Sequence, residues 1–294
     1  MLLSVFDFDL SKWMLQRYTI FSEYERIGHL FSLFCAKLHQ HIKKIIIFAP
    51  PNCYLFIDNC YLYMPLWKDD AELFSIARKE LFPALVGDIL DKMGYQHQFI
   101  SPLIKPVRQD MVVVGRAMPV LEADVFNEKL GDDTHNPLLR KPFGIMFEAL
   151  DSLQPGEVYI CSGSSPRYAL WGGLMSTRAI YCGAAGAVVD GYSRDTNEIL
   201  RLNFPTFSMG GYAQDQGPRG KVLDYRTPIE FSGVRVNPGD VVFGDLDGVL
   251  IVPAEAVTDA FEGAIGKARG EQLVAQAIRA GMCTVEAFAK IGIM

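Results

Sequence analysis

The chain lacks the residue patterns that would assign it to several common classes of protein. Its six cysteines form no Cys-x-x-Cys pair, and its five histidines include no pair at metal-ligand spacing within residues 64–294. These absences argue against a zinc ribbon, a disulfide scaffold and a histidine-based metal centre. No predicted strand leads into Gly-x-Gly-x-x-Gly, so a nucleoside-cofactor site of the methyltransferase kind has no support. A reducing cytoplasm fits this cysteine usage best.

Positive charge and uninterrupted apolar runs are also scarce. The 28 Lys and Arg residues against 34 Asp and Glu residues give a net charge of −6, which disfavours a broad surface for binding phosphates. The nearest approach to a membrane span, residues 45–67, contains Pro50, Pro51 and Asp58. Charged or unsatisfied groups are costly within a bilayer. We therefore expect neither nucleic acid nor a membrane as a partner.

Glycine is almost absent from the first 66 residues, where Gly28 stands alone among dense aromatic residues and cysteines. Glycine-punctuated elements begin only after that point. We therefore expect residues 1–63 to be an extension distinct from a domain over residues 64–294. Two explanations for the extension remain open. It packs on the domain, or it is upstream sequence and Met64 is the natural start.

Helix-like and strand-like segments mix along the second part of the chain, which predicts an α/β fold. Helical spacing or helix signals predict helices over 71–81, 143–153, 169–182 and from 257 onward. Short apolar or alternating runs predict strands over 111–114, 158–161, 186–189, 228–236, 241–243 and 248–253.

The stretch most informative about function, residues 167–176, contains Gly172 and Gly173, and twenty residues separate Gly173 from the pair Arg194 and Asp195. Two glycines before a helix let backbone N–H groups approach a ligand carboxylate. A carboxylate that follows the buried strand 186–189, here Asp195, can hold a hard divalent cation. Arg194 can then stabilise an oxygen that gains negative charge. Taken alone, such features are more often tight packing and a surface salt bridge.

Several ordered segments of the chain match one known pattern: 85–94, 114–117, 171–173, 186–195, 231–240 and 245–249. Together they resemble the RraA-like family. This family includes divalent-metal-dependent 4-hydroxy-4-methyl-2-oxoglutarate (4-carboxy-4-hydroxy-2-oxoadipate) aldolases and regulators of ribonuclease E activity. The resemblance implies a swivelling β/β/α domain, with central β-structure layered with helices, assembled as a homotrimer or dimer of trimers.

The resemblance also implies roles for individual residues. Asp195 matches the ligand of Mg²⁺ or Mn²⁺, and Arg194 matches the catalytic contact to the substrate oxygen. Leu174 and Met175 match the residues whose backbone amides hold the keto-acid carboxylate. Glu271 is the nearest match to a glutamate that a neighbouring subunit contributes.

One position departs from the aldolase pattern, because the family's acidic residue falls on Gly173, which has no side chain. We expect a metal-dependent lyase of small 2-oxo-diacids, acting by retro-aldol cleavage to pyruvate or by oxaloacetate decarboxylation through an enolate. The missing acid should slow proton transfer by about 10²–10⁴-fold, so that Gly173→Asp should raise turnover. The alternative is a non-catalytic RraA-like binding or regulatory protein.

The change of composition near residue 64 yields a prediction about the extension. Expression of residues 64–294 should give a folded oligomer, because the recognisable domain begins there. Size-exclusion chromatography and circular dichroism of the truncated and full-length proteins make the comparison. An insoluble or monomeric truncated protein beside an oligomeric full-length protein would show that the extension is required.

Overall fold

The computed structural model describes residues 56–57, 60–61, 66–125 and 135–292. The chain divides into two compact units, Met1–Met64 and Pro65–Met294. In the first unit the described residues form an antiparallel pair, β1 (Phe56–Ile57) and β2 (Cys60–Tyr61). The rest of the extension expected over residues 1–63 lies outside the described residues. The second unit carries all the features that follow.

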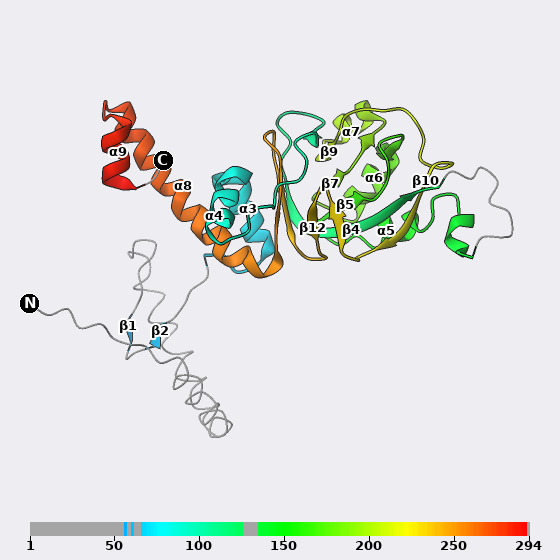
Figure 1. The fold of residues 1–294 in the computed structure, drawn as a ribbon, viewed down its shortest axis with the longest axis horizontal. Helices are drawn as coiled ribbons and strands as arrows, with labels where there is room; N and C mark the ends of the chain where they lie inside the picture. Colours follow the sequence, from blue (N-terminus) through cyan, green and yellow to red (C-terminus); the bar gives the residue numbers. More distant parts are fainter. Residues whose placement is uncertain (1–55, 58–59, 62–65, 126–134, 293–294) are drawn as a thin grey trace, which may run out of the picture. The chain divides into compact units, whose positions relative to one another are not determined.

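An eight-stranded mixed sheet forms the centre of this unit (Figure 1). The strand order is β14-β13-β4-β5-β7-β9-β3, and β10 pairs with β4. Strands β4, β5, β7 and β9 run parallel, whereas β3, β10, β13 and β14 pair antiparallel with their neighbours. The bounds are β3 Lys105–Pro106, β4 Val113–Asp124, β5 Glu157–Ser162, β7 Gly186–Val189, β9 Thr206–Ser208, β10 Gly220–Tyr225, β13 Val241–Gly244 and β14 Val249–Val252.

Successive residues of the central strands enter different cores, because side chains alternate between the two faces of a sheet. Tyr159 and Cys161 of β5 pack with α5, α6 and α7, whereas Val158 and Ile160 face a second core on the other side. A third core lies where α3, α4 and α8 cover β4, β13 and β14. The helices are α3 Asp70–Glu80, α4 Pro83–Lys92, α5 Met146–Asp151, α6 Gly173–Tyr181, α7 Thr196–Leu202, α8 Val257–Arg279 and α9 Thr284–Ile291. The predicted α/β class, with β-structure layered by helices, is confirmed.

The helix expected over residues 169–182 begins later than the sequence suggested. Ala169–Trp171 is a buried strand, β6, which pairs in parallel with β8 (Tyr192–Ser193). Gly172 is extended, with φ −157°, and α6 starts at the next residue. Three apolar residues in a row fit a buried strand and a buried helix equally well, so their spacing alone misassigned them.

The single strand expected over residues 228–236 is instead a hairpin of β11 (Ile229–Phe231) and β12 (Val234–Val236). Ser232 and Gly233 form its two-residue turn, with φ values of 53° and 85°. Two successive positive φ values suit the tight turns of antiparallel hairpins. The prediction of a single strand was wrong because apolar and polar residues continue to alternate across the turn.

The β4–β10 pair buries a carboxyl group away from water. Glu122 is 2% exposed, and its Oε1 accepts a hydrogen bond of 2.6 Å from Nε2 of Gln216. Burial raises the pKa of Glu122 to about 8, and the nearby negative charge of Asp124 acts in the same direction. The hydrogen bond from Gln216 opposes this shift only in part. The folded protein therefore favours the protonated, neutral form of Glu122.

This carboxyl group makes stability depend on pH. The pKa of Glu122 is about 8 when folded against an ordinary value of 4.5, so the folded state holds a proton that the unfolded state has lost between these pH values. The free energy of unfolding should fall as pH rises from about 4.5 to about 8, and Glu122→Gln should remove this part of the fall. Urea unfolding between pH 5 and pH 8 measures it. Asp224→Asn removes the charge of an exposed acid and serves as the control. The prediction would be contradicted if the free energy of unfolding varied with pH in the same way in wild type and in Glu122→Gln.

Candidate functional site

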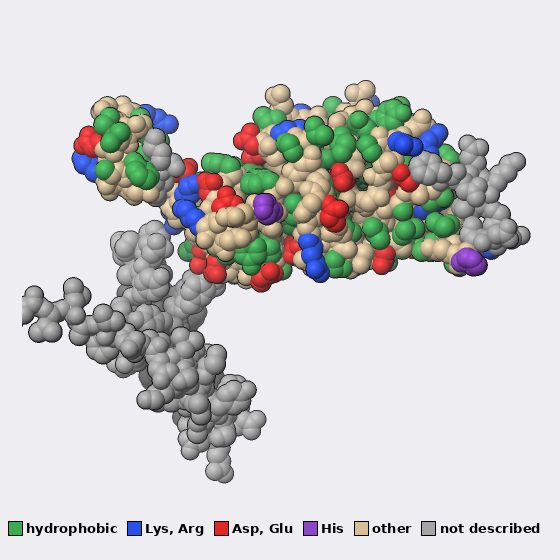
Figure 2. All heavy atoms as spheres, viewed as in Figure 1, with side chains coloured by type: hydrophobic (Ala, Val, Ile, Leu, Met, Phe, Trp, Pro, Cys, Tyr) green, Lys and Arg blue, Asp and Glu red, His purple; other side chains and the backbone are tan. Residues whose placement is uncertain are grey.

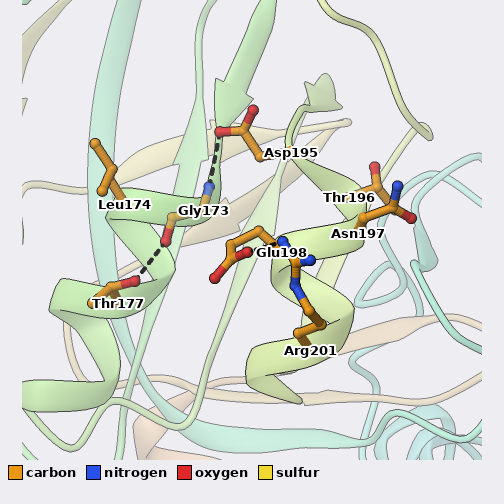
Figure 3. Close-up of a pocket in the computed structure, with 8 residues that line it drawn as sticks. All are labelled: Gly173, Leu174, Thr177, Asp195, Thr196, Asn197, Glu198 and Arg201. Atoms are coloured by element: carbon orange, nitrogen blue, oxygen red, sulfur yellow. Dashed lines mark hydrogen bonds and ion pairs between the residues drawn. The ribbon is translucent and has the colours of Figure 1, made fainter.

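Two helices begin side by side at one end of the β6–β8 pair. Trp171 of β6 is in register with Ser193 of β8, and the N–H of Arg194 donates to the carbonyl of Trp171 over 2.8 Å. Because the two strands are parallel, the chain leaves both at the same edge. It enters α6 at Gly173 and α7 just after Asp195. Figure 3 shows both helix starts facing one pocket.

The first turn of α6 is held by the buried Trp171. Its Nε1 donates to Oγ of Ser176 over 2.8 Å, and that hydroxyl donates to the carbonyl of Gly172 over 3.0 Å. The indole ring also stacks on Phe204, with ring centroids 5.9 Å apart. Helix geometry leaves the N–H groups of the first turn, at residues 173–175, without acceptors in their own helix. The site thus contains fixed backbone donors.

Asp195 connects the two helix starts. Its backbone is left-handed, with φ 57°, and its carbonyl accepts the N–H groups of Glu198 and Ile199 that open α7. Its side chain does not cap α7, because Oδ2 instead accepts the N–H of Gly173 in α6 over 3.1 Å. A non-glycine residue in this conformation costs of order 1–3 kcal/mol and persists only where its surroundings hold it.

The Asp195 carboxylate remains accessible. Its side chain is 49% exposed, and among the described residues no hydrogen-bond donor reaches its second oxygen, Oδ1. Nε of Arg194 lies 3.8 Å from Oδ2. Oδ2 is therefore bonded to the start of α6, whereas Oδ1 is left to bind a ligand.

Arg194 is oriented by an acid that the sequence did not suggest. Its Nη1 lies 2.6 Å from Oδ1 of Asp215, whose other oxygen accepts the N–H of Gly217 over 2.9 Å. A side chain at position 172 would meet Oδ2 of Asp195 at 2.9 Å and Cγ of Arg194 at 3.4 Å. Glycine is therefore needed at this position for both groups to sit beside α6.

The pocket between the helix starts has a volume of about 500 Å³. Of the residues predicted from the sequence, Gly173, Leu174 and Asp195 line it, whereas Gly172, Met175 and Arg194 do not. The full lining is Gly173, Leu174 and Thr177 from α6, with Asp195, Thr196, Asn197, Glu198 and Arg201 from α7 and the turn before it. The sequence did not suggest Thr177 or the last four of these residues.

Glu271 lies elsewhere in its own chain. It is on α8, where its carboxylate is 3.5 Å from Nζ of Lys267, and that lysine also pairs with Asp88. It does not line the pocket of its own chain. Its expected contribution to a neighbouring subunit stays a prediction.

Glu198 fills the space beside Gly173. A Cβ atom at position 173 would lie 2.9 Å from Cγ and 3.1 Å from Cβ of Glu198, and 3.4 Å from Cβ of Asp195. The side chains of Glu198 and Asp195 thus surround the position that the Cβ atom of an acidic residue at 173 would take. Gly173→Asp would therefore have to displace Glu198. Whether this substitution raises turnover stays a prediction.

The carboxylate oxygens of the pocket fit a divalent cation that keeps most of its bound water. Among the residues that the structure describes, no cluster of three or more His, Cys, Asp or Glu side chains could enclose a metal. Two carboxylates, from Asp195 and Glu198, line the pocket. Mg²⁺ usually binds proteins through one or two carboxylates together with several waters and substrate oxygens. The residues present therefore suit Mg²⁺, or Mn²⁺ with the same oxygen ligands.

The surface offers no broad basic patch on the face shown in Figure 2, where Lys and Arg side chains are scattered among acidic and hydrophobic ones. Within the described part of the chain, every helix is too short or too polar to cross a membrane.

Comparison with known proteins places this fold and site in a family. The family model described as RraA-like, Aldolase/RraA, matches residues 84–251. This match covers more than half of the chain, so the protein belongs to the RraA-like family. It includes the β6–β8 pair, both helix starts and Asp215.

Individual relatives agree with this assignment. A protein of Halalkalibacterium halodurans named "Putative 4-hydroxy-4-methyl-2-oxoglutarate aldolase" is 28% identical over 221 residues, which cover 74% of this chain and 95% of that protein. Protein DlpA of Legionella pneumophila is 28% identical over 199 residues, which cover 67% of this chain. The match spans only 30% of DlpA, and only 54% of protein MJ0644 of Methanocaldococcus jannaschii, which is 32% identical over 113 residues.

Solved structures share the fold. An uncharacterized protein from Pseudomonas syringae superposes with a TM-score of 0.64 at 22% identity, covering 80% of this chain and all of that one. Streptomyces coelicolor RraAS2, described as an unusual member of the RNase ES inhibitor RraA family, gives a TM-score of 0.60 at 21% identity, covering 71% of this chain and 99% of that one. At these identities the likeness shows the fold alone.

The crowding at position 173 predicts a difference between two glycine substitutions. Gly173→Ala should destabilise the protein by about 1–3 kcal/mol, as overpacking usually does, because the added Cβ meets Glu198. Gly266→Ala, within α8 with no atom near the added Cβ, should stabilise it by about 0.4–1 kcal/mol. Urea unfolding measures both, and a Gly173→Ala protein as stable as Gly266→Ala would contradict the packing described.

Proposed function

We propose that the protein is a divalent-metal-dependent carbon–carbon lyase of small 2-oxo-diacids. The reactions would be retro-aldol cleavage to pyruvate and decarboxylation of oxaloacetate. The observation that carries this proposal is the Asp195 carboxylate. It has one oxygen without a protein donor among the described residues, and it stands beside the first turn of α6, where the Leu174 and Met175 amides have no acceptor in their own helix. Membership of the RraA-like family and the aldolase name of a relative support the reaction class.

The residues of the pocket would divide the work of binding. The first-turn amides of Leu174 and Met175 would donate to the substrate carboxylate, as helix starts do for anions. Asp195 would hold Mg²⁺ or Mn²⁺, which when bound would supply Lewis-acid polarisation of the 2-oxo group. The pocket of about 500 Å³ has room for a small diacid.

Arg194 would stabilise the negative charge that develops on the substrate. Both reactions break a bond to the carbon next to the 2-oxo group and leave an enolate, so an enolate-stabilising site could serve either. A positive group held in place before the reaction needs no reorganisation when charge develops. The ion pair with Asp215 supplies that orientation for Arg194.

We also propose that the active assembly is a homotrimer or a dimer of trimers, in which Glu271 of one copy approaches the pocket of the next. Family membership supports this proposal. The ion pairs of Glu271 and Lys267 lie on α8, apart from the pocket of the same chain.

The competing function is non-catalytic binding of another protein by the same fold. The absence of an acidic side chain at Gly173 favours it. The two functions differ in turnover, because only the lyase releases pyruvate from an aldol substrate or from oxaloacetate.

Turnover of an Asp195 variant tests the proposal. Wild type with Mg²⁺ or Mn²⁺ should release pyruvate, and Asp195→Asn should lower the rate by about 10²-fold or more, since Lewis-acid stabilisation is worth several kcal/mol. Asp151→Asn, which alters an exposed acid paired with Arg178, should retain the wild-type rate. A wild type that releases no pyruvate with either metal would favour the binding protein, and an Asp195→Asn protein as active as wild type would refute the metal assignment.

A further inference from the structure

We infer that Arg201 binds the distal carboxylate of the 2-oxo-diacid, which is the carboxylate farther from the 2-oxo group. This inference rests on the proposed lyase function and names the side chain that selects diacids over 2-oxo acids with a single carboxylate. The other end of the substrate lies on the amides of Leu174 and Met175 and on the cation at Asp195.

The charges of the pocket support this assignment. Among the described residues that line the pocket, Arg201 alone is positively charged, and the other charged side chains are the acids Asp195 and Glu198. A second carboxylate that met only these acids would be repelled. Thr196 and Asn197 offer neutral donors, and charge-assisted hydrogen bonds are roughly twice as strong as neutral ones. Arg201 is therefore the side chain of the pocket best suited to bind a second carboxylate.

The guanidinium of Arg201 is directed toward the start of its helix. Arg201 lies in the last turn of α7, and its Nη2 donates to Oε2 of Glu198, three residues earlier. Residues three apart are neighbours on one face of a helix, so this contact brings the guanidinium back by about one turn. Figure 3 shows the Arg201 side chain running along α7 toward Glu198. The positive charge thus lies nearer to Asp195 than the Cα atom of Arg201 does.

The guanidinium keeps hydrogen-bond donors for a ligand. Arginine carries five N–H donors in a planar fork that matches the two oxygens of a carboxylate. Within the described part of the chain its hydrogen-bond acceptor is Glu198, and the side chains of Arg201 and Glu198 are 73% and 43% exposed, respectively. Exposed ion pairs are weak because water and salt screen them. A substrate carboxylate can therefore share the guanidinium with Glu198 or replace it.

The assignment distinguishes the two proposed reactions, in both of which the bond between C3 and C4 breaks and its electron pair forms the enolate, which takes up a proton at C3. In a 4-hydroxy-2-oxo-diacid the 4-hydroxyl loses its proton, C4 becomes a carbonyl carbon, and the distal carboxylate keeps its charge. In oxaloacetate the distal carboxylate itself leaves as CO₂ and loses its charge. A guanidinium that stabilises the charged carboxylate therefore opposes decarboxylation alone. Arg201 thus favours retro-aldol cleavage.

Two matched ligands test the inference without turnover. 2-Oxoglutarate and 2-oxopentanoate have the same five-carbon 2-oxo acid chain, but only 2-oxoglutarate has a distal carboxylate, and neither reaction cleaves them. Calorimetry in the same excess of Mg²⁺ should show about ten-fold tighter binding of 2-oxoglutarate by wild type, as expected for hydrogen bonds between charged groups. Arg201→Gln should lose this preference. Arg201→Lys should keep a preference of about three-fold, because lysine retains the charge without the fork.

Arg178→Gln is the matched control. Arg178 is a partly exposed arginine of the neighbouring helix α6, where it pairs with Asp151, and it does not line the pocket. This variant removes the same charge as Arg201→Gln. It should bind both ligands as wild type does.

Turnover provides a second measurement. With a 4-hydroxy-2-oxo-diacid, Arg201→Gln should raise KM about ten-fold at an unchanged kcat, because a contact made equally in the ground state and the transition state affects KM alone. With oxaloacetate, kcat should stay the same or rise. A ten-fold lower kcat with both substrates would show that Arg201 acts on the chemical step and would overturn the assignment.

The binding results separate this inference from the proposed function. Equal affinity of wild type for the two ligands, or a preference that persists in Arg201→Gln, would overturn the inference and leave the proposed lyase intact. A wild type that binds neither ligand with Mg²⁺ or Mn²⁺ would contradict the proposed function, and with it the carboxylate site at Arg201.

Discussion

The hydrogen bond from the N–H of Gly173 to Oδ2 of Asp195 joins two helix starts that are otherwise separate in sequence. The parallel β6–β8 pair brings the two helix starts to the same edge, and this bond fixes the Asp195 carboxylate against the first amide of α6. With it, the amides of α6 and the acids of α7 face one space. The remaining features of the site serve to keep this bond in place.

Several of those features lower the stability of the folded protein, and packing in the core of the domain offsets this loss. Asp195 holds a left-handed backbone, and residues 172 and 173 must both be small, because a side chain at either would meet the groups of α7 or the turn before it. The buried indole of Trp171 fixes the start of α6 through Ser176. Strained positions that are fixed by their surroundings are common at functional sites. Here the strain places an acid beside backbone donors.

Strands β5, β7, β13 and β14 could be predicted from the sequence because they are short, largely apolar and buried runs. The strand expected over residues 111–114 instead runs over Val113–Asp124, where charged residues interrupt the apolar pattern. The strand at Gly186–Val189 has the predicted bounds, and it leads within a few residues to Arg194 and Asp195. The segment Ala169–Trp171 could not be assigned correctly, since only its pairing with β8 distinguishes it from a helix. The pattern of apolar residues therefore predicts such strands. A segment whose pattern fits both a strand and a helix is decided only by the strand with which it pairs.

The candidate site was predictable only as far as its residues are neighbours in sequence. Asp215 lies about twenty residues beyond Arg194 in an irregular loop, and nothing local marks it as the partner of that guanidinium. Glu198 carried a usable signal, because an acid three residues after Asp195 at a helix start falls on the same face. Its relation to Gly173 depends on the contact between α6 and α7, which no spacing reveals.

The central claim is that the acids of α7 and the amides of α6 form one site for a cation and a 2-oxo acid. Anomalous diffraction from crystals grown with Mn²⁺ and oxalate tests it most directly. The account predicts a manganese peak about 2 Å from Asp195, with oxalate on the amides of Leu174 and Met175 and Glu198 facing both. Manganese bound away from Asp195, or oxalate bound outside this pocket, would contradict it.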